Sequence, residues 1–171
     1  EALRKIVPTA DELEAKLQYI VDGTLLPCWS WASHPELYSG KHKTTGMNVQ
    51  VACTMSGSLA WLSDPIDGRR HDSYCLGESG VLLTLDPADW MGDKGYEGNG
   101  MLTPFKKPAG RDLLDWERKF NTQINKIRYV IERTIATFKT WRIMHTDYRR
   151  PIETFPTTIS AVIGLHFYTA S

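Results

Sequence analysis

The sequence predicts an α/β fold in which a mixed five-stranded sheet is flanked by helices. Three stretches of the chain carry this prediction. Residues 47–55 alternate apolar and polar side chains, residues 120–138 repeat apolar side chains at helical spacing, and residues 157–170 contain no Asp, Glu, Lys or Arg. The first pattern is typical of a strand, the second of an amphipathic helix, and the third of a helix buried against a sheet.

The length and charge of the chain limit its architecture. A chain of 171 residues is suited to one domain with a sizeable core. Its net charge is zero, but the charge is unevenly distributed. Residues 1–105 contain 8 Lys and Arg against 14 Asp and Glu (net −6), whereas residues 106–150 contain 12 against 5 (net +7). The basic part either attracts phosphate or forms a solvated helix, and charge alone favours neither interpretation.

The composition also indicates a compartment. The apolar runs are too short to cross a membrane, and no basic-then-apolar leader follows Glu1, so neither a transmembrane segment nor a signal peptide is predicted. Cys28, Cys53 and Cys75 are odd in number and widely spaced, which fits neither a disulfide framework nor a zinc site. We therefore expect a reducing, cytoplasmic compartment.

The order of the local patterns gives the expected topology. Strands are recognised by short apolar or alternating runs, helices by capping residues and helical periodicity, and turns by Gly, Pro and Asp. The long helix is expected to be broken near Asn121. The expected elements are a short helix opened by a Thr9–Glu12 capping box within an N-terminal segment (1–17), a strand (18–22), a long loop (25–46), a half-buried strand (47–55) joined by the turn Ser56-Gly57 to its hairpin partner (59–62), a helix (72–77), a strand (89–93), an edge strand (101–105), a long helix (112–143) and a final helix (157–170).

Three carboxylates occupy positions that are unusual for solvated surface acids. Asp22 and Asp93 each follow a short apolar run, at the expected C-terminal end of a strand, where the sites of open α/β sheets tend to lie. Glu132 lies on the long helix, beside its apolar stripe and between cations. Three such carboxylates can converge on hard divalent cations, because Mg²⁺ prefers oxygen ligands.

Short motifs around these acids resemble those of a known family. They are VDGT at 21–24, YSGKHKTTGMNVQV at 38–51, GRRHDS at 68–73, GDKGY at 92–96, and an R-x3-E-x6-K pattern formed by Arg128, Glu132 and Lys139. In this order they resemble the DDE transposases of the insertion-sequence and PIF/Harbinger type, which have a ribonuclease-H-like fold. The resemblance covers residues 18–145 and implies a catalytic domain over residues 18–171. Asn125 replaces a tyrosine of many relatives, and no upstream helix-turn-helix DNA-binding domain is visible.

The resemblance implies a metal-dependent enzyme that acts on DNA. Asp22, Asp93 and Glu132 would be catalytic and would bind two Mg²⁺ (or Mn²⁺) ions. The implied reactions are phosphodiester hydrolysis at transposon ends and strand transfer into target DNA. The implied partners are transposon-end and target DNA, within a homodimer or larger synaptic complex and without a membrane. A bacterial protein of this kind would act in the cytoplasm at the nucleoid, and a eukaryotic one in the nucleus.

Further residues have both a functional and a structural interpretation. His71 and Asp72 match a family motif and are expected beside the acids, although the residue type of Asp72 favours helix capping. Arg128 is spaced equally well for an ion pair with Glu132. The loop tryptophans Trp29 and Trp31, and also Trp141, either stack on bases or pack in the core, and the core is favoured. The expected contacts to DNA phosphates are Lys41, Lys43, Lys94, Arg128, Lys139 and Arg142.

The sequence leaves three other functions open. A transposase-derived DNA-binding protein that no longer cuts would be expected to lose one of the acids first. Another nuclease of the same fold, such as a resolvase or ribonuclease H, would be expected to have an additional clustered acid, for which Asp72 is the candidate. In a purely structural α/β domain the acids would never meet.

Overall fold

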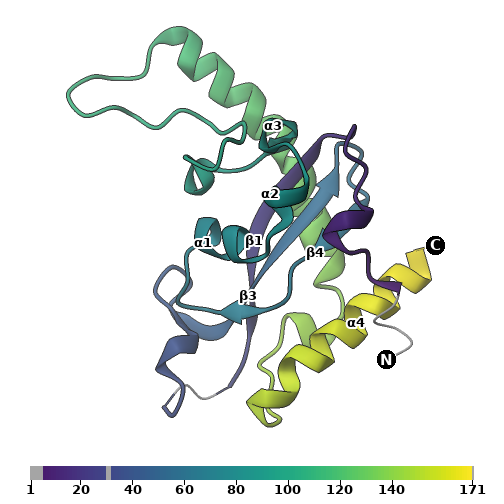
Figure 1. Ribbon diagram of the computed structural model, residues 1–171. Helices are drawn as coiled ribbons and strands as arrows, with labels where there is room; N and C mark the ends of the chain where they lie inside the picture. Colours follow the sequence, from purple (N-terminus) through teal and green to yellow (C-terminus); the bar gives the residue numbers. More distant parts are fainter. Residues whose placement is uncertain (1–5, 30–31, 171) are drawn as a thin grey trace.

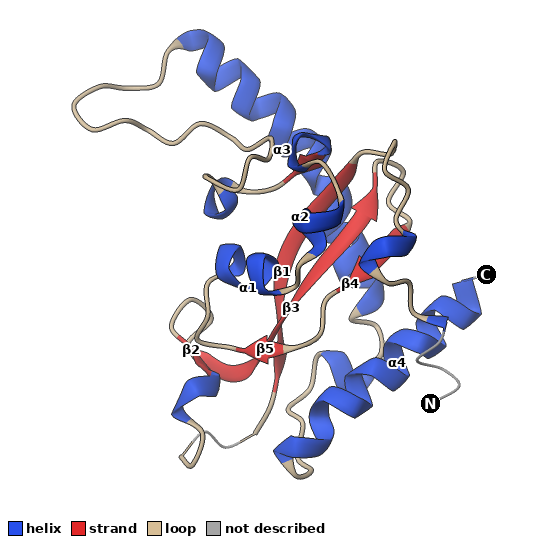
Figure 2. Ribbon diagram, in the orientation of Figure 1, coloured by secondary structure: helices blue, strands red, loops and turns tan. Residues whose placement is uncertain are grey.

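The computed structural model describes residues 6–29 and 32–170 and shows a curled mixed sheet with helices on both of its faces (Figures 1 and 2). Within these residues the sheet has six strands rather than the five expected. Two short strands beside the central β3 were not anticipated, and the expected edge strand at 101–105 is reduced to one isolated bridge between Met91 and Leu102. The strands are β1 (Tyr19–Pro27), β2 (Tyr38–Ser39), β3 (Thr44–Thr54), β4 (Leu59–Leu62), β5 (Ile66–Asp67) and β6 (Trp90–Met91).

The central strand β1 is longer than the sequence predicted. It pairs antiparallel with β3 along its whole length, from Tyr19 opposite Thr54 to Pro27 opposite Gly46. Its parallel partner β6 covers only the first two residues of β1. Asp22 is therefore inside a strand and not at its end, because the non-local pairing with β3 continues the strand where the local apolar run stops.

The second central strand, β3, was expected to be half-buried, and this expectation is wrong. Val49, Val51 and Cys53 face the larger core cluster, as their alternation predicted. The polar side chains of Asn48 and Gln50, on the opposite face, are also buried. The hairpin to β4 is present, with a register shift between Ala52 and Cys53.

The helices largely follow the predicted pattern. The expected break near Asn121 is absent: the helix continues through this residue, whose side chain hydrogen-bonds to the backbone N–H and C=O of Phe105. The Thr9–Glu12 contact is present, but the helix that it opens is a single 3₁₀ turn. The helices are α1 (Asp72–Glu78), α2 (Val81–Thr84), α3 (Asp115–Phe138) and α4 (Phe155–Ala170), and the 3₁₀ turns are η2 (Ala10–Glu12), η3 (Pro35–Leu37), η4 (Pro87–Asp89), η5 (Lys94–Tyr96), η6 (Arg142–Met144) and η7 (Ile152–Thr154).

Two hydrophobic clusters bind the helices to the sheet. On one face, Ile131 and Phe138 of α3 and Ile159 of α4 pack against β1 and β3. On the other face, Leu76 of α1 and Val81 of α2 pack against the same two strands. The sheet is thus a middle layer between α1 with α2 and α3 with α4. In the described ranges no helix has the length and apolar character needed to cross a membrane.

The burial of α3 generates a stability prediction. Phe138 is fully buried in the larger cluster, so Phe138→Ala should lower the free energy of unfolding by about 3–5 kcal/mol through lost contacts and a residual cavity. Leu83→Ala is the control, because Leu83 is 89% exposed and its loss should change the free energy by less than about 0.5 kcal/mol. Urea unfolding measures both. Equal effects of the two substitutions would contradict this packing.

Candidate functional site

Two of the predicted acids lie side by side at one edge of the sheet. In the parallel register of β1 and β6, Tyr19 is opposite Trp90 and Ile20 is opposite Met91, and Asp22 and Asp93 come two residues later in their segments. Each carboxylate is oriented by a nearby backbone N–H. Asp22 Oδ1 accepts from Gly23 at 2.9 Å, and Asp93 Oδ1 accepts from Gly95 at 2.6 Å at the start of η5.

Asp22 has an environment that disfavours its charge. Burial raises the pKa of Asp22 to about 6, a guanidinium from Arg128 opposes this effect, and the carboxylates of Asp93 and Asp72 add to it. The Arg128 Nη2 atom lies 3.6 Å from Asp22 Oδ2. Arg128 therefore pairs with Asp22 and not, within the described chain, with Glu132, which was its alternative partner. The Arg128 Nε atom is buried and has no hydrogen-bond partner among the described residues.

Asp72 does not cap α1, so the interpretation favoured by its residue type is wrong. The residue at the N-cap is His71, whose side chain is exposed and makes no capping hydrogen bond. Asp72 Oδ2 instead accepts from Lys41 Nζ at 2.7 Å, and Asp72 Oδ1 accepts from Asn48 Nδ2 at 2.7 Å. Burial raises the pKa of Asp72, but the hydrogen bonds from Lys41 and Asn48, the positive charge of Lys41 and the Gln50 side chain outweigh it and leave the pKa below its ordinary value.

A chain of hydrogen bonds continues from Asp72 into the core. Gln50 Nε2 donates to Asn48 Oδ1 at 2.8 Å, and the Tyr96 hydroxyl donates to Gln50 Oε1 at 2.6 Å. Gln50 and Tyr96 are fully buried. The chain therefore links the segment after β6, which contains Asp93, to β3 and to the start of α1. We call these five side chains, Lys41, Asp72, Asn48, Gln50 and Tyr96, the Asp72 network.

Three members of this network, Asn48, Gln50 and Tyr96, were not predicted from the sequence. All three lie inside the quoted motifs, but no spacing rule marks a buried polar chain. The one available signal was the pair of amides on a single face of the alternating strand, which was interpreted as a solvated face.

Gly23 is required by the Asp72 network. A Cβ atom at this position would lie 2.1 Å from Asp72 Oδ1 and 2.9 Å from Gln50 Nε2. Only a residue without a side chain allows the carboxylate of Asp72 to approach the backbone beside Asp22. The Asp-Gly pair at 22–23 thus has a steric explanation.

Glu132 makes no contact with Asp22, Asp93 or Asp72 among the described interactions. It is exposed on α3. It lies one turn after Arg128 and seven residues before Lys139, whose Nζ donates to the backbone carbonyl of Leu25 in β1 at 2.9 Å. Among the described residues, no three His, Cys, Asp or Glu side chains are close enough to hold a metal ion. Asp22, Asp93 and Asp72 interact electrostatically, while Glu132 lies on the helix stripe between two contacts to β1.

The predicted phosphate-binding cations fall into two groups. Lys41, Arg128 and Lys139 make the contacts described above, and burial lowers the pKa of Lys139. The others are exposed: Lys43, Lys94 and Arg142.

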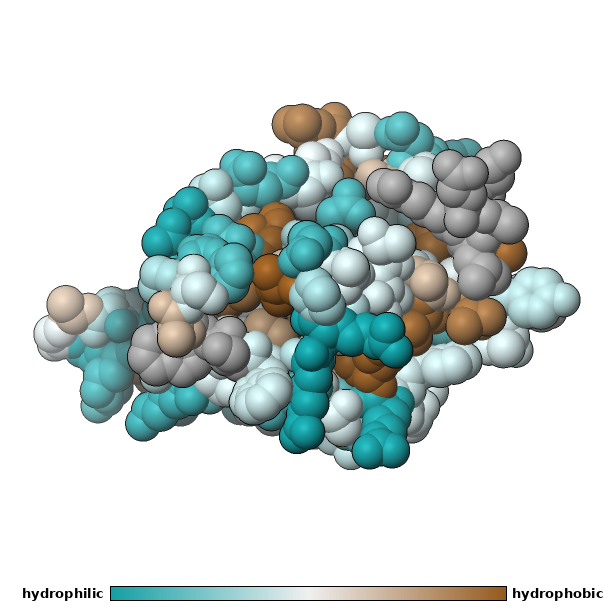
Figure 3. Space-filling model, turned by 90° about the horizontal axis from the view of Figure 1, so that it is seen from below, coloured by the Kyte–Doolittle hydropathy of each residue, from teal (hydrophilic) through white to brown (hydrophobic). Residues whose placement is uncertain are grey.

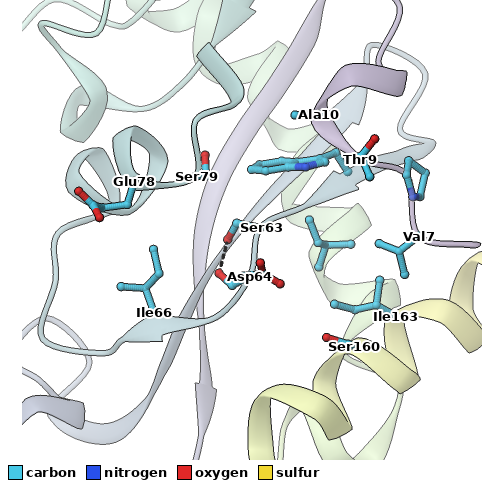
Figure 4. A pocket seen from close by; sticks show the side chains of 13 residues that line it. Val7, Thr9, Ala10, Ser63, Asp64, Ile66, Glu78, Ser79, Ser160 and Ile163 are labelled. Carbon is cyan, nitrogen blue, oxygen red and sulfur yellow. Dashed lines mark hydrogen bonds between the residues drawn. The ribbon is translucent and has the colours of Figure 1, made fainter. Parts of the chain in front are cut away.

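A separate cavity of about 480 Å³ lies away from the acids. Figure 4 shows that it lies between the N-terminal segment, β4, α1 and α4, with Glu78 and Asp64 among its lining residues. None of the site residues predicted from the sequence lines it. The cavity therefore does not coincide with the candidate site, the carboxylates beside β1 and β6.

The contact at Gly23 generates a prediction with an internal control. Gly23→Ala should lower the free energy of unfolding by about 1–3 kcal/mol, because the new Cβ would overlap the carboxylate of Asp72. Gly40→Ala should change it by less than about 0.5 kcal/mol, since nothing lies within 4 Å of that position. In chemical denaturation, Asp72→Ala should relieve part of the Gly23→Ala penalty. Strict additivity of the two substitutions would refute the contact.

The raised pKa of Asp22 predicts how stability depends on pH. Between about pH 4 and pH 6 the unfolded chain ionises Asp22 while the folded chain keeps it protonated, so the metal-free protein loses stability as the pH rises. Asp22→Asn removes this effect. The free energy of unfolding of the variant minus that of the wild type should therefore increase by up to about 3 kcal/mol between about pH 4 and pH 8, measured by chemical denaturation in EDTA. A difference that stays constant with pH would contradict the raised pKa.

Comparison with known proteins places the chain in the family that its motifs resemble. The chain is 30% identical over 127 residues to "Putative transposase for insertion sequence element IS112" from Streptomyces albus G, covering 73% of this chain and 48% of that protein. It is 26% identical over 141 residues to "Probable transposase for insertion sequence element IS702" from Microchaete diplosiphon, covering 80% of this chain and 51% of that protein. It thus spans about half the length of these relatives. No solved structure matches it significantly. A family model described as DDE superfamily endonuclease matches residues 21–166. The chain therefore belongs to the DDE superfamily endonuclease family.

Proposed function

We propose that this chain is the catalytic domain of a DNA transposase, which hydrolyses phosphodiesters at transposon ends and transfers the freed strand into target DNA. The observation that carries the proposal is the adjacency of Asp22 and Asp93 at the edge of the sheet, with α3 contacting β1 beside them. The names of the two insertion-sequence relatives support the same function. Because the chain spans only part of those proteins, the complete reaction is part of the proposal.

The donor atoms at this site fit a divalent metal ion. Asp22 and Asp93 are acidic oxygen donors, the ligands that Mg²⁺ and Mn²⁺ prefer. Each carboxylate near Asp22 makes its ionisation less favourable, so a bound cation would relieve the repulsion within the cluster. We propose that Asp22, Asp93 and Glu132 hold the metal, as two ions of Mg²⁺ or Mn²⁺. When bound, such ions polarise a phosphate and lower the pKa of water.

Glu132 has a position from which it can complete the site. Arg128 and Lys139, on the same stripe of α3, both reach β1, so the helix surface that carries Glu132 faces the strand that carries Asp22. In the proposed site, the exposed Glu132 side chain would turn toward Asp22 by rotation about its own torsions.

The cations around the acids are suited to hold a DNA strand. Lys43, Lys94 and Arg142 are exposed and would contact phosphates directly. Arg128 has a buried Nε atom without an acceptor, which a phosphate oxygen near Asp22 would satisfy. Water attack at the transposon end would free a 3′-hydroxyl, and that hydroxyl would then attack the target strand. We further propose assembly into a homodimer or larger synaptic complex on DNA, in the bacterial nucleoid, or in the nucleus in the case of a eukaryotic source.

A nuclease of the same fold is the second candidate function. The observation that favours it is the position of Asp72, whose carboxylate interacts with Asp22 and is not used for capping. In that case Asp72 would be a fourth acid of the metal site, whereas in the transposase it positions Asp22 through Gly23. His71, exposed beside it, would contact DNA or solvent in either case. A descendant that binds DNA but no longer cuts is disfavoured because all three acids are present.

Substitution of the acids tests the proposal. Strand nicking of a labelled duplex in Mg²⁺ or Mn²⁺ should fall at least about 100-fold in Asp22→Asn, Asp93→Asn and Glu132→Gln, since each removes a metal ligand. Glu97→Gln is the control, because Glu97 is paired at the surface with Lys106 at 2.8 Å and should leave nicking unchanged.

Metal binding measured by calorimetry separates the candidates. In a transposase, Asp72→Asn should retain metal binding with reduced affinity, whereas in the alternative nuclease it should abolish binding as Asp22→Asn does. Stoichiometric metal binding that survives substitution of all three acids would refute the site.

A further inference from the structure

The far end of β1 holds an exposed tryptophan in a fixed position. Cys28 forms a parallel bridge with Tyr148, the Trp29 N–H donates to the Tyr148 carbonyl at 2.9 Å, and the Tyr148 N–H donates to the Pro27 carbonyl at 3.1 Å. Figure 1 shows the segment that leads into α4 beside this end of β1. Two backbone hydrogen bonds with Tyr148 therefore hold the chain in place from Pro27 to Trp29.

The side chain of Trp29 does not belong to the core, contrary to the interpretation favoured from the sequence. It is 64% exposed, whereas Trp141 packs partly buried against the larger cluster. Trp31 lies outside the described residues. The Arg149 guanidinium carbon lies 5.3 Å from the centre of the Trp29 ring. A large aromatic ring that is kept in water and backed by a cation is a typical stacking surface.

The segment that contacts this ring is rich in positive charge. Arg142, Arg149 and Arg150 are exposed, and the segment 142–150 contains a single acid, Asp147. The segment encloses a hollow of about 660 Å³. Seen from below, the molecule presents hydrophilic residues interspersed with smaller apolar areas (Figure 3). Charge and aromatic surface occur together here, as at sites for nucleic acid strands.

Cations also connect this end of β1 with the acids. Along the strand, Arg128 contacts Asp22, Lys139 contacts Leu25, and Arg149 contacts Trp29. The seven residue-to-residue steps from Asp22 to Trp29 span about 23 Å of extended chain, or roughly seven nucleotides at 3.4 Å each. A DNA strand with one phosphate at the acids can therefore reach the ring.

We propose that Trp29 and Arg149 form a stacking site for an unpaired DNA base, with Arg142 and Arg150 on the adjacent phosphates. The inference rests on the proposed function, because it takes DNA as the substrate, and it adds a structural preference. An unpaired base is the proposed occupant, because the bases inside a duplex are stacked on each other and have no free face with which to stack on the tryptophan ring.

Binding of short DNA in EDTA tests this site without metal or cleavage. Fluorescence anisotropy is measured with a labelled oligothymidylate of about 12 nucleotides and with a blunt duplex of the same length. Trp29→Ala should weaken binding of the single strand about tenfold or more and that of the duplex less than about threefold. Trp29→Phe should retain most of the affinity. Arg149→Ala with Arg150→Ala should weaken both ligands and flatten their salt dependence.

Trp116→Ala is the matched control, because Trp116 is 56% exposed and packs on Phe105 in another part of the chain. It should leave single-strand binding unchanged. The proposal is overturned if the wild type does not bind the single strand, or if Trp29→Ala has no effect on it. Equal losses of single-strand and duplex affinity in Trp29→Ala would also overturn it. If these tests fail while metal-dependent nicking still requires the three acids, the stacking site is wrong and the proposed function stands.

Discussion

The approach of the Asp72 carboxylate to the backbone at Gly23 is the constraint on which the site depends. A carboxylate that is largely removed from water is costly unless it is paired and hydrogen-bonded. Lys41 supplies the charge and Asn48 supplies the hydrogen bond. Gly23 supplies the space, because any side chain there would occupy the position of the carboxylate.

This constraint explains why four separate segments contain the residue types that they do. Lys41, Asn48 and Gln50 come from β3 and the turn before it, Asp72 from the start of α1, and Tyr96 from η5. Because Tyr96 follows Asp93 by three residues, its bond to Gln50 ties the Asp93 turn to the same strand that pairs with Asp22. The two acids are thus held by one continuous set of bonds through the sheet. The pKa of Asp22 is raised mainly because the carboxyl group is buried there, and the carboxylates of Asp93 and Asp72 raise it further.

Local patterns predicted what local forces determine. The apolar stripe of α3, the hairpin of β3 and β4, and the uncharged α4 were predicted because periodicity and turn residues fix them. The extension of β1 past Asp22 was missed because its pairing with β3 comes from a distant segment. Asp72 was misassigned because a tertiary contact with Lys41 and Asn48 prevailed over capping propensity. That Asp22 and Asp93 lie close together was predicted only in so far as both were expected at strand ends. The side-chain position of Glu132 does not follow from its place on the helix.

The extension of β1 has a consequence for function, because one strand carries both Asp22 and, just beyond its end, Trp29. All nine residues of β1 are paired with β3, so the separation of these two side chains is fixed by a hydrogen-bonded ladder and not by a loop. Helix α3 runs beside the same strand and contacts it through Arg128 and Lys139. A DNA strand that follows these cations would meet the acids and the ring at a constant spacing. A fixed spacing of this kind allows binding at one end of β1 to place a particular phosphate at the other.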